Sequence, residues 1–405
     1  MKKKIELLSP AGDFRSLSAT IKAGCDAVYL GLKEFNMRDS AKNFSIKDLD
    51  IINKMCTLPN KKIKVYLTLN TIIYDNELIK INKILKQIKN KVDAVICWDL
   101  SVIQLCKKYK IPFHISTQAS ISNIQSALFY KKLGAERVIL ARELNLKQIK
   151  KISKIIEIET FIHGAMCSSI SGRCFTSQFL HCKSANRGAC RHPCRKSYKV
   201  IDDEGNELRV ENSRIFSAKD LCTLPFLEKL KKAGITAFKI EGRNREPEYV
   251  YAVTSIYRKA LDKKLSKKEI EESLKELEKV YNREFSSGFY LKLPTSDDLT
   301  KSESGAQKST KELIGKITHY WDKIKVASVH LVHNELRLGD EIYVQGNTTF
   351  FKHKITDMEI NHKKVVKAVK GQDVAIKLEK CRENDEVYLI LERDKKLGYN
   401  KKDKG

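Results

Sequence analysis

The chain has 405 residues, which is more than a single hydrophobic core usually fills, so a large domain and a smaller one are expected. Its 77 Lys and Arg residues outnumber 50 Asp and Glu residues, and the formal net charge of +27 attracts polyanions such as nucleic acids, although a lysine-rich surface that binds nothing has the same composition. No apolar run is long enough to span a membrane and no apolar segment follows the basic start, so a cytoplasmic protein is expected.

Short apolar segments alternate with longer amphipathic segments from the first residues onward. This alternation is typical of repeated βα units around a parallel sheet. The expected strands are residues 5–9, 27–31, 63–69, 94–97, 113–116, 137–140, 159–162 and 237–240. Eight such strands predict an α/β fold, a (β/α)8 TIM-like barrel over residues 1–292, and a doubly wound sheet is the alternative.

The helices expected between these strands are amphipathic. They cover residues 13–23, 76–89, 100–108, 122–133 and 224–233. Gly24, Gly134 and Gly234 each stand where such a helix should end before the next strand, a position that glycine commonly occupies.

The connection after the seventh expected strand is much longer than the others. It runs over residues 163–222, whereas a βα loop usually needs about two to six residues. The segment follows the carboxyl end of its strand, and in barrel enzymes that end carries the active site. We therefore predict that this insertion is a functional element.

The composition changes after a lysine-rich helical segment at residues 266–279. Residues 293–312 are polar and predict a linker, and a basic tail follows at 393–405. Between them, short strands are expected at residues 313–319, 325–331, 341–345, 350–358, 365–368, 373–378 and 385–390. They predict a small all-β barrel over residues 313–392, and its lysines make it a candidate RNA-binding module. Tyr343, Phe350 and Phe351 are candidates for stacking on unpaired bases, although aromatic residues at strand spacing more often belong to the core.

The eleven cysteines fall into two groups. Five stand singly in apolar segments, whereas six crowd into the insertion: Cys167, Cys174, Cys182, Cys190, Cys194 and Cys222. Disulfides are not expected in a reducing compartment, which leaves buried thiols, metal ligands or redox chemistry. Buried thiols are the less favoured alternative for the crowded group, because its mostly polar segment has little core to cover six cysteines. The long, irregular spacings favour an iron–sulfur cluster over zinc, whose structural sites prefer closely paired cysteines.

The sequence around these cysteines resembles the collagenase-like peptidase family U32. The blocks that carry the resemblance are ELLSPAGD at 6–13, ETFIHGAMCSSISGRC at 159–174, NRGACRHPCR at 186–195, SAKDLC at 217–222 and FKIEGR at 238–243. The resemblance spans essentially the whole chain and implies a barrel with a cysteine-bound [4Fe–4S] cluster. In addition, the segments 336–346 and 365–378 resemble the second domain of translational GTPases.

For the cluster we predict Cys167, Cys174 and Cys190 as ligands. Cys222 is placed ahead of Cys194 as the fourth ligand, because a bond to Cys222 would order the far end of the insertion. Cys194 is the alternative, since it lies on the same short turn as Cys190.

Within the family, the chain resembles most the members that take part in forming 5-hydroxyuridine at the tRNA wobble position, with prephenate as the implied hydroxyl source. This resemblance implies tRNA, a small dicarboxylate and a paralogous subunit as partners. The alternatives are hydroxylation of rRNA or of a quinone precursor, and a collagenase-like peptidase acting on denatured protein. A peptidase is less favoured because the chain has no His-Glu-x-x-His motif and offers a group of thiols in place of one activated cysteine.

A dicarboxylate substrate predicts guanidinium groups at the carboxyl ends of the strands. Four arginines have such positions: Arg142, Arg173, Arg195 and Arg243. Glu241 leaves the eighth strand beside Arg243 either as a catalytic group or as its salt-bridge partner. His163 is the candidate proton carrier, although a loop histidine more often makes a structural hydrogen bond. Further polar contacts are expected from Thr117, Gln118 and Glu143.

Overall fold

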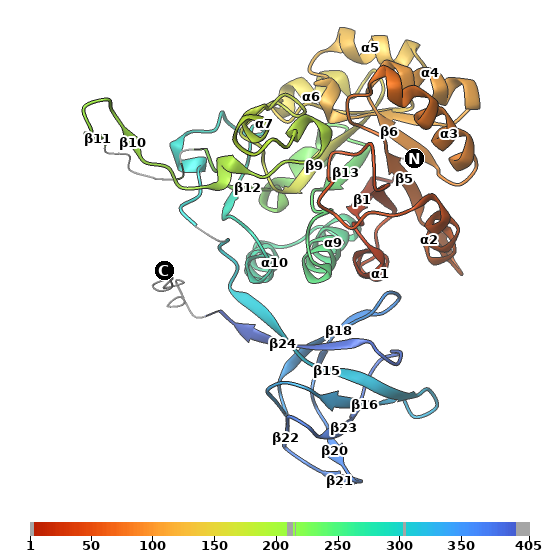
Figure 1. The fold of residues 1–405 in the computed structure, drawn as a ribbon, viewed down its shortest axis with the longest axis vertical. Helices are drawn as coiled ribbons and strands as arrows, with labels where there is room; N and C mark the ends of the chain where they lie inside the picture. The colour runs from red at the N-terminus through yellow and green to blue at the C-terminus, as the bar shows by residue number, and fades with distance from the viewer. Residues whose placement is uncertain (1–3, 209–213, 215, 303–304, 394–405) are drawn as a thin grey trace.

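The computed structural model describes residues 4–208, 214, 216–302 and 305–393. Figure 1 shows a barrel part, an insertion that projects from it, and a β region packed below the barrel. The expected basic tail lies outside the described residues from 394 onward. No helix in the described part of the chain is long and apolar enough to cross a membrane.

Eight parallel strands close into a barrel, as predicted. In the order of their hydrogen bonding they are β1 (Glu6–Pro10), β2 (Ala27–Gly31), β5 (Lys64–Thr68), β6 (Ala94–Cys97), β7 (Phe113–Ile115), β8 (Arg137–Ile139), β9 (Glu157–Gly164) and β13 (Ala237–Ile240). The pairing of β13 with both β1 and β9 closes the ring and rules out the doubly wound alternative.

Amphipathic helices surround this barrel, and their apolar faces pack on the outside of the strands. They are α1 (Phe14–Lys22), α2 (Leu49–Cys56), α3 (Leu78–Ile88), α4 (Leu100–Tyr109), α5 (Ile124–Lys132), α6 (Leu146–Ile152), α8 (Leu227–Lys232), α9 (Pro247–Asp262) and α10 (Lys267–Lys279). Asp13 begins α1 by accepting a hydrogen bond from the Ser16 backbone N–H at 2.8 Å, as expected of an N-cap residue.

The insertion between β9 and α8 contains little regular structure. It holds the short helix α7 (Thr176–His181), the hairpin β10 (Val200–Ile201) and β11 (Glu207–Leu208), and the strand β12 (Asp220–Cys222). β12 pairs antiparallel with β9 and parallel with β14 (Phe285–Ser286). The end of the insertion is therefore fixed to the barrel sheet.

The C-terminal part of the chain is an antiparallel β region with its own hydrophobic core. Its main strands are β15 (Ser309–Trp321), β16 (Val326–Leu331), β18 (Glu341–Gln345), β19 (Phe350–Lys354), β20 (Glu359–Ile360), β21 (Lys363–Lys364), β23 (Asp373–Lys377) and β24 (Glu386–Glu392). They pair in the order β19-β18-β24-β15-β16-β23-β20-β21, and β17 (Glu335–Arg337) pairs separately with β22 (Lys367–Val369). β15 begins inside the segment expected as a linker.

The β region docks on α1 and α9 (Figure 1). Arg15 of α1 pairs with Glu386 at 2.5 Å, and the ring of Tyr251 in α9 lies 5.1 Å from that of Phe350. Phe350 and Phe351 are both only 3% exposed. Of the two alternatives for these rings, packing in the core is the one that the structure confirms, and stacking of the two rings on RNA bases is excluded because packing already covers them.

Candidate active site

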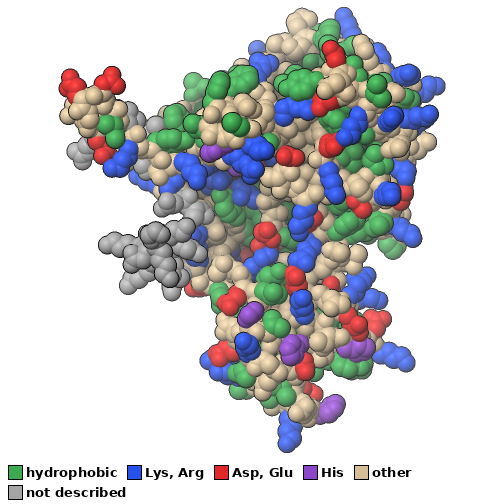
Figure 2. Space-filling view, in the orientation of Figure 1, with side chains coloured by type: hydrophobic (Ala, Val, Ile, Leu, Met, Phe, Trp, Pro, Cys, Tyr) green, Lys and Arg blue, Asp and Glu red, His purple; other side chains and the backbone are tan. Residues whose placement is uncertain are grey.

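A cavity of about 740 Å³ lies at the carboxyl ends of the barrel strands, where the insertion covers them. Its barrel side includes Tyr29, Thr68, Phe161 and Lys239, and its other side is formed by residues of the insertion. Figure 2 shows a hollow below the insertion with Lys and Arg side chains gathered beside it. The volume is in the range of sites that bind small molecules, roughly 300–1,000 Å³.

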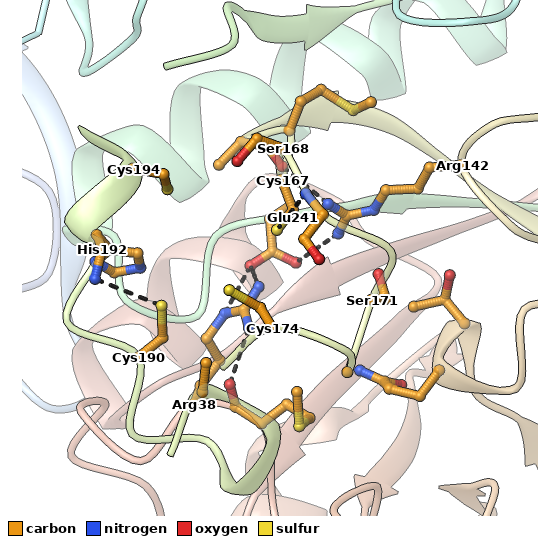
Figure 3. A pocket seen from close by; sticks show the side chains of 18 of the residues that line it. Arg38, Arg142, Cys167, Ser168, Ser171, Cys174, Cys190, His192, Cys194 and Glu241 are labelled. Atoms are coloured by element: carbon orange, nitrogen blue, oxygen red, sulfur yellow. Dashed lines mark hydrogen bonds and ion pairs between the residues drawn. The ribbon is translucent and has the colours of Figure 1, made fainter. Parts of the chain in front are cut away.

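Four cysteine side chains line this cavity: Cys167, Cys174, Cys190 and Cys194 (Figure 3). All four thiols are free of disulfides. The Ser169 backbone N–H donates to Cys167 Sγ at 3.5 Å, and the His192 N–H donates to Cys190 Sγ at 3.4 Å. Such N–H donors to sulfur are among the contacts by which proteins tune cluster-bound thiolates.

Cys222 is not part of this group. It is 4% exposed in strand β12, its Sγ lies 3.8 Å from the Tyr257 hydroxyl, and it does not line the cavity. Burial raises the pKa of the Cys222 thiol to about 11. Of the two cysteines considered for a fourth ligand, the structure thus brings Cys194, and not Cys222, to the other three.

The four thiols match the ligand number of a [4Fe–4S] cluster, which is larger than a single ion. Within the described residues, no group of three His, Cys, Asp or Glu side chains is arranged to hold one metal ion directly. Burial raises the pKa of Cys190, and the neighbouring Cys194 and Cys167 add to this effect. A metal centre bound here would displace the thiol protons, as thiolate ligation requires.

Glu241, at the end of β13, links two arginines in the cavity (Figure 3). Arg38 approaches Glu241 Oε1 with Nη2 at 2.8 Å and Nε at 3.1 Å, and Arg142 Nη2 lies 3.8 Å from Oε2. Burial alone would raise the Glu241 pKa, but Arg38 and Arg142 outweigh it and hold the pKa at about 2. Glu241 is therefore ionised at neutral pH and holds the two guanidinium groups in place.

Within the described residues, the hydrogen bonds of the Arg243 side chain go to neutral partners. It is 4% exposed, and it donates to Thr68 Oγ1 at 3.0 Å and to Asn36 Oδ1 at 2.8 Å. Burial, and then Arg38, lower its pKa to about 10, so the side chain stays cationic at neutral pH. Gly31 leaves the space that Arg243 occupies, because a Cβ there would lie 2.2 Å from Arg243 Nη1. The expected pairing of Arg243 with Glu241 is replaced by the contacts of Glu241 with Arg38 and Arg142.

The cavity lining is strongly cationic. Glu241 is its single acidic residue, against eight basic ones: Arg38, Arg142, Arg173, Arg195, Lys239, Arg243, Arg245 and Arg283. Such an excess of positive charge in a concave site favours an anionic ligand.

His163 does not reach the cavity. It is 1% exposed, packs against the rings of Tyr249, Tyr257 and Phe285, and has Nδ1 3.4 Å from the Tyr257 hydroxyl. Burial, with a further contribution from Arg245, lowers its pKa to about 3. The structure therefore places the expected proton carrier in the packing between β9, β12 and α9.

Some of the other residues expected at the site line the cavity, and one does not. Thr117, Gln118, Arg173 and Arg195 line the cavity, whereas Glu143 is exposed and lies outside the lining. Arg195 donates to Ser217 Oγ at 3.2 Å and to the Ala218 carbonyl at 2.7 Å near the end of the insertion, and to the Met166 carbonyl near its start, so it ties the two ends of the insertion together.

Four basic residues of the cavity were not expected from the sequence: Arg38, Lys239, Arg245 and Arg283. Arg38 follows β2, at the same end of the barrel as Arg142 and Arg243, and that position was the available signal. Lys239 lies within the buried strand β13, with Nζ 2.9 Å from Glu159 Oε1. A lysine in the middle of an apolar strand was the signal for Lys239.

Comparisons with known proteins agree on one family. A family profile described as Peptidase family U32 matches residues 12–300. An uncharacterized protease of Methanocaldococcus jannaschii is 41% identical, over 96% of this chain and 98% of that protein. A collagenase of Porphyromonas gingivalis is 38% identical with the same coverage. A tRNA hydroxylation protein P of Haemophilus influenzae is 30% identical, over 96% of each chain.

The order of these similarities differs from the expected one. The protease and the collagenase are both more similar to this chain than the tRNA hydroxylation protein. Sequence similarity therefore establishes the family and leaves the choice among its activities to the site.

Proposed function

The chain belongs to peptidase family U32, and from that membership and its cavity we propose that it is an iron–sulfur enzyme that hydroxylates the wobble uridine of tRNA to 5-hydroxyuridine. The observation that carries the proposal is a single cavity in which four free thiols adjoin eight basic residues and one acidic residue. The same cavity offers ligands for a redox cofactor and charges for an anionic substrate.

The cluster ligands in this proposal are Cys167, Cys174, Cys190 and Cys194. A [4Fe–4S] cluster bound by them supplies one-electron chemistry. Ser169 and His192 orient two of the sulfur atoms through their backbone N–H groups. The cationic surroundings favour the negative charge that four thiolates bring to the site.

The co-substrate in this proposal is a small dicarboxylate, with prephenate as the specific candidate. Arg243 presents a guanidinium group fixed by Thr68 and Asn36, and Arg38 and Arg142 present two more that Glu241 holds. Guanidinium groups fixed in this way bind carboxylates with two parallel hydrogen bonds. Glu241 is a positioning residue, because a carboxylate with a pKa of about 2 is a weak proton acceptor at neutral pH.

The uridine must leave its stack to reach such a cavity, as bases do in other enzymes that act on nucleic acids. In this proposal the cavity of about 740 Å³ receives the flipped base and the small dicarboxylate next to the cluster. The volume does not by itself select tRNA over rRNA or a quinone precursor, and the relative named for tRNA hydroxylation, aligned over 96% of the chain, favours tRNA.

A collagenase-like peptidase is the second candidate, because the relatives named as a protease and a collagenase are the more similar ones. A cysteine peptidase needs a histidine ring that accepts a proton from one thiol. The contact between His192 and Cys190 is made by the backbone N–H of His192, and His163 lies outside the cavity. These two positions favour hydroxylation over proteolysis.

Nucleoside mass spectrometry of tRNA from cells that lack this chain, with any paralogue also removed, tests the proposal. The expected result is loss of 5-hydroxyuridine and its derivatives. Unchanged tRNA nucleosides, together with gelatin degradation by the purified protein, would support the peptidase instead.

A further inference from the structure

The insertion exposes large apolar side chains at the mouth of the cavity. Phe175 is 62% exposed and Phe179 is 82% exposed, and their ring centroids lie 6.4 Å apart. Phe216 is 50% exposed, and its ring lies 5.8 Å from that of Tyr198. We call these four residues the aromatic rim. Three of them, Phe175, Tyr198 and Phe216, also line the cavity, so the rim and the reaction site are continuous.

Phe175, Phe179 and Tyr198 stand in a segment without acidic residues, whereas Phe216 follows the acidic hairpin of β10 and β11. Residues 163–199 contain seven Lys and Arg residues and no Asp or Glu. Arg173 and Arg191 are both exposed there. Figure 2 shows hydrophobic side chains over α7 with Lys and Arg side chains next to them. Exposed aromatic rings interleaved with basic side chains are the usual means by which proteins bind single-stranded nucleic acid.

We propose that the aromatic rim stacks on unpaired nucleotides of an RNA loop, next to the base that enters the cavity. This inference rests on the proposed function, and it specifies that the enzyme recognises its RNA as a single strand. The two ring pairs are tilted or edge-on, with interplanar angles of 48° and 79°, so neither pair is a closed face-to-face stack. The exposed fractions of Phe175, Phe179 and Phe216 leave ring surface for a base to contact.

Charge argues for RNA rather than an unfolded polypeptide as the occupant. Aromatic grooves also bind polyproline-type segments, but those grooves need no excess of positive charge. Here the rim adjoins a cavity with eight basic residues and one acidic residue. The β region, by contrast, is nearly balanced in charge, because its residues 313–392 contain thirteen Lys and Arg against twelve Asp and Glu.

The test measures binding of the full-length, anaerobically purified protein to two labelled RNAs. One is a hairpin with an unpaired loop, and the other is a blunt duplex of the same stem sequence. The variants are Phe175→Ala/Phe179→Ala and Phe175→Tyr/Phe179→Tyr. The matched control is Phe129→Ala, because Phe129 is 57% exposed on α5 and does not line the cavity.

The hairpin is expected to bind wild type more tightly than the duplex does. The double alanine variant should bind the hairpin on the order of ten- to a hundred-fold more weakly, with an unchanged salt slope, because stacking is lost and phosphate contacts are kept. The double tyrosine variant and Phe129→Ala should bind as wild type does. Arg191→Gln should instead reduce the salt slope by about one ion.

Equal binding of the hairpin by the double alanine variant and wild type would overturn the inference. Equal affinity of wild type for the hairpin and the duplex would also overturn it. The same holds if the double alanine variant loses binding to gelatin and keeps its binding to RNA. These outcomes are separate from failure of the proposed function, which is read from tRNA nucleosides. If the deletion strain loses 5-hydroxyuridine and the rim variants bind RNA as tightly as wild type, only the inference about the aromatic rim is refuted, and the proposed function stands.

Discussion

Single thiols determine where a cluster can bind. Cys194 lines the cavity with three other cysteines, whereas Cys222 is covered by Tyr257. We predict that Cys194→Ser loses most of the iron bound per chain and that Cys222→Ser keeps it, because only the first removes a thiol that faces the cavity. Iron and sulfide counted per chain after anaerobic purification measure this.

Cys182→Ser is the exposed control for this pair, since Cys182 is exposed and does not line the cavity. It should retain full iron content. Iron loss in Cys222→Ser with full retention in Cys194→Ser would show that the insertion rearranges around the cluster and would refute the ligand set.

His163 gives a pH dependence of stability. Its pKa of about 3 lies below the ordinary value near 6.5, so below pH 6.5 the unfolded chain binds a proton that the folded chain refuses. The free energy of unfolding should therefore fall by about 1 kcal/mol from this residue between pH 7 and pH 5.5. His163→Gln should lack that contribution.

Denaturant unfolding of wild type and His163→Gln at the two pH values isolates the effect. The buried His114, whose pKa burial also lowers, acts equally in both proteins and cancels in the comparison. An identical pH dependence in the two proteins would mean that His163 is protonated in the folded state. Full iron content in His163→Gln is also expected, because the ring does not touch the cavity.

Two of the cavity arginines could be predicted from the sequence because of their positions after barrel strands. Arg142 and Arg243 follow strands, and the carboxyl ends of parallel strands meet in a barrel, so both reach the cavity. His163 was misplaced because the strand was expected to end at residue 162, whereas β9 continues to Gly164 and turns the ring into the packing. Strand ends depend on long-range pairing, here with β12 and β13, which one sequence does not reveal.

At the scale of elements, the barrel strands were predictable because helices cover them and their burial makes them apolar throughout. The fully buried strands β2, β6 and β13 have the bounds expected from the sequence. The helices named from the sequence pattern did not include α2, α6 and α9. α2 and α6 have eight and seven residues, and segments that short carry little periodicity. α9 has sixteen residues and follows the last barrel strand, so it lies outside the helices expected between strands.

The docking of the β region depends on an aromatic contact between elements. Phe350 of β19 packs on Tyr251 of α9 and stacks on Tyr343 with centroids 5.6 Å apart. Phe350→Ala should therefore lower the free energy of unfolding by about 3 kcal/mol, the usual cost of removing a buried phenyl ring. Chemical denaturation followed by circular dichroism measures it.

RNA binding should be unchanged in Phe350→Ala under native conditions, because the ring faces α9 and not solvent. If a folded Phe350→Ala protein binds RNA more weakly than wild type, the prediction is contradicted and Phe350 contacts RNA.

At the scale of the whole molecule, the positive charge is unevenly distributed. Residues 1–312 contain 58 Lys and Arg against 36 Asp and Glu, while residues 313–392 are nearly balanced. The RNA should therefore bind mainly to the barrel and its insertion. Replacing Lys354, Lys363 and Lys370 together with Gln should leave both the tRNA affinity and its salt slope unchanged, as measured by titration at several salt concentrations.

If the salt dependence of tRNA affinity in that triple variant falls by about three ions, the β region contacts the RNA phosphates, contrary to this prediction. Composition alone suggested a lysine-rich RNA-binding module there. Ion pairs such as Lys352–Glu341 at 2.8 Å and Lys367–Glu335 at 2.5 Å show why a count of lysines overstated its charge.

The central claim is that the cavity with four thiols performs RNA hydroxylation. Its most direct test is nucleoside mass spectrometry of tRNA from a deletion strain that carries wild type, Cys194→Ser or Cys222→Ser at equal protein levels. We predict that wild type and Cys222→Ser restore 5-hydroxyuridine and that Cys194→Ser does not. Restoration by Cys194→Ser, or unchanged 5-hydroxyuridine in the deletion strain itself once any paralogue is removed, would contradict the claim.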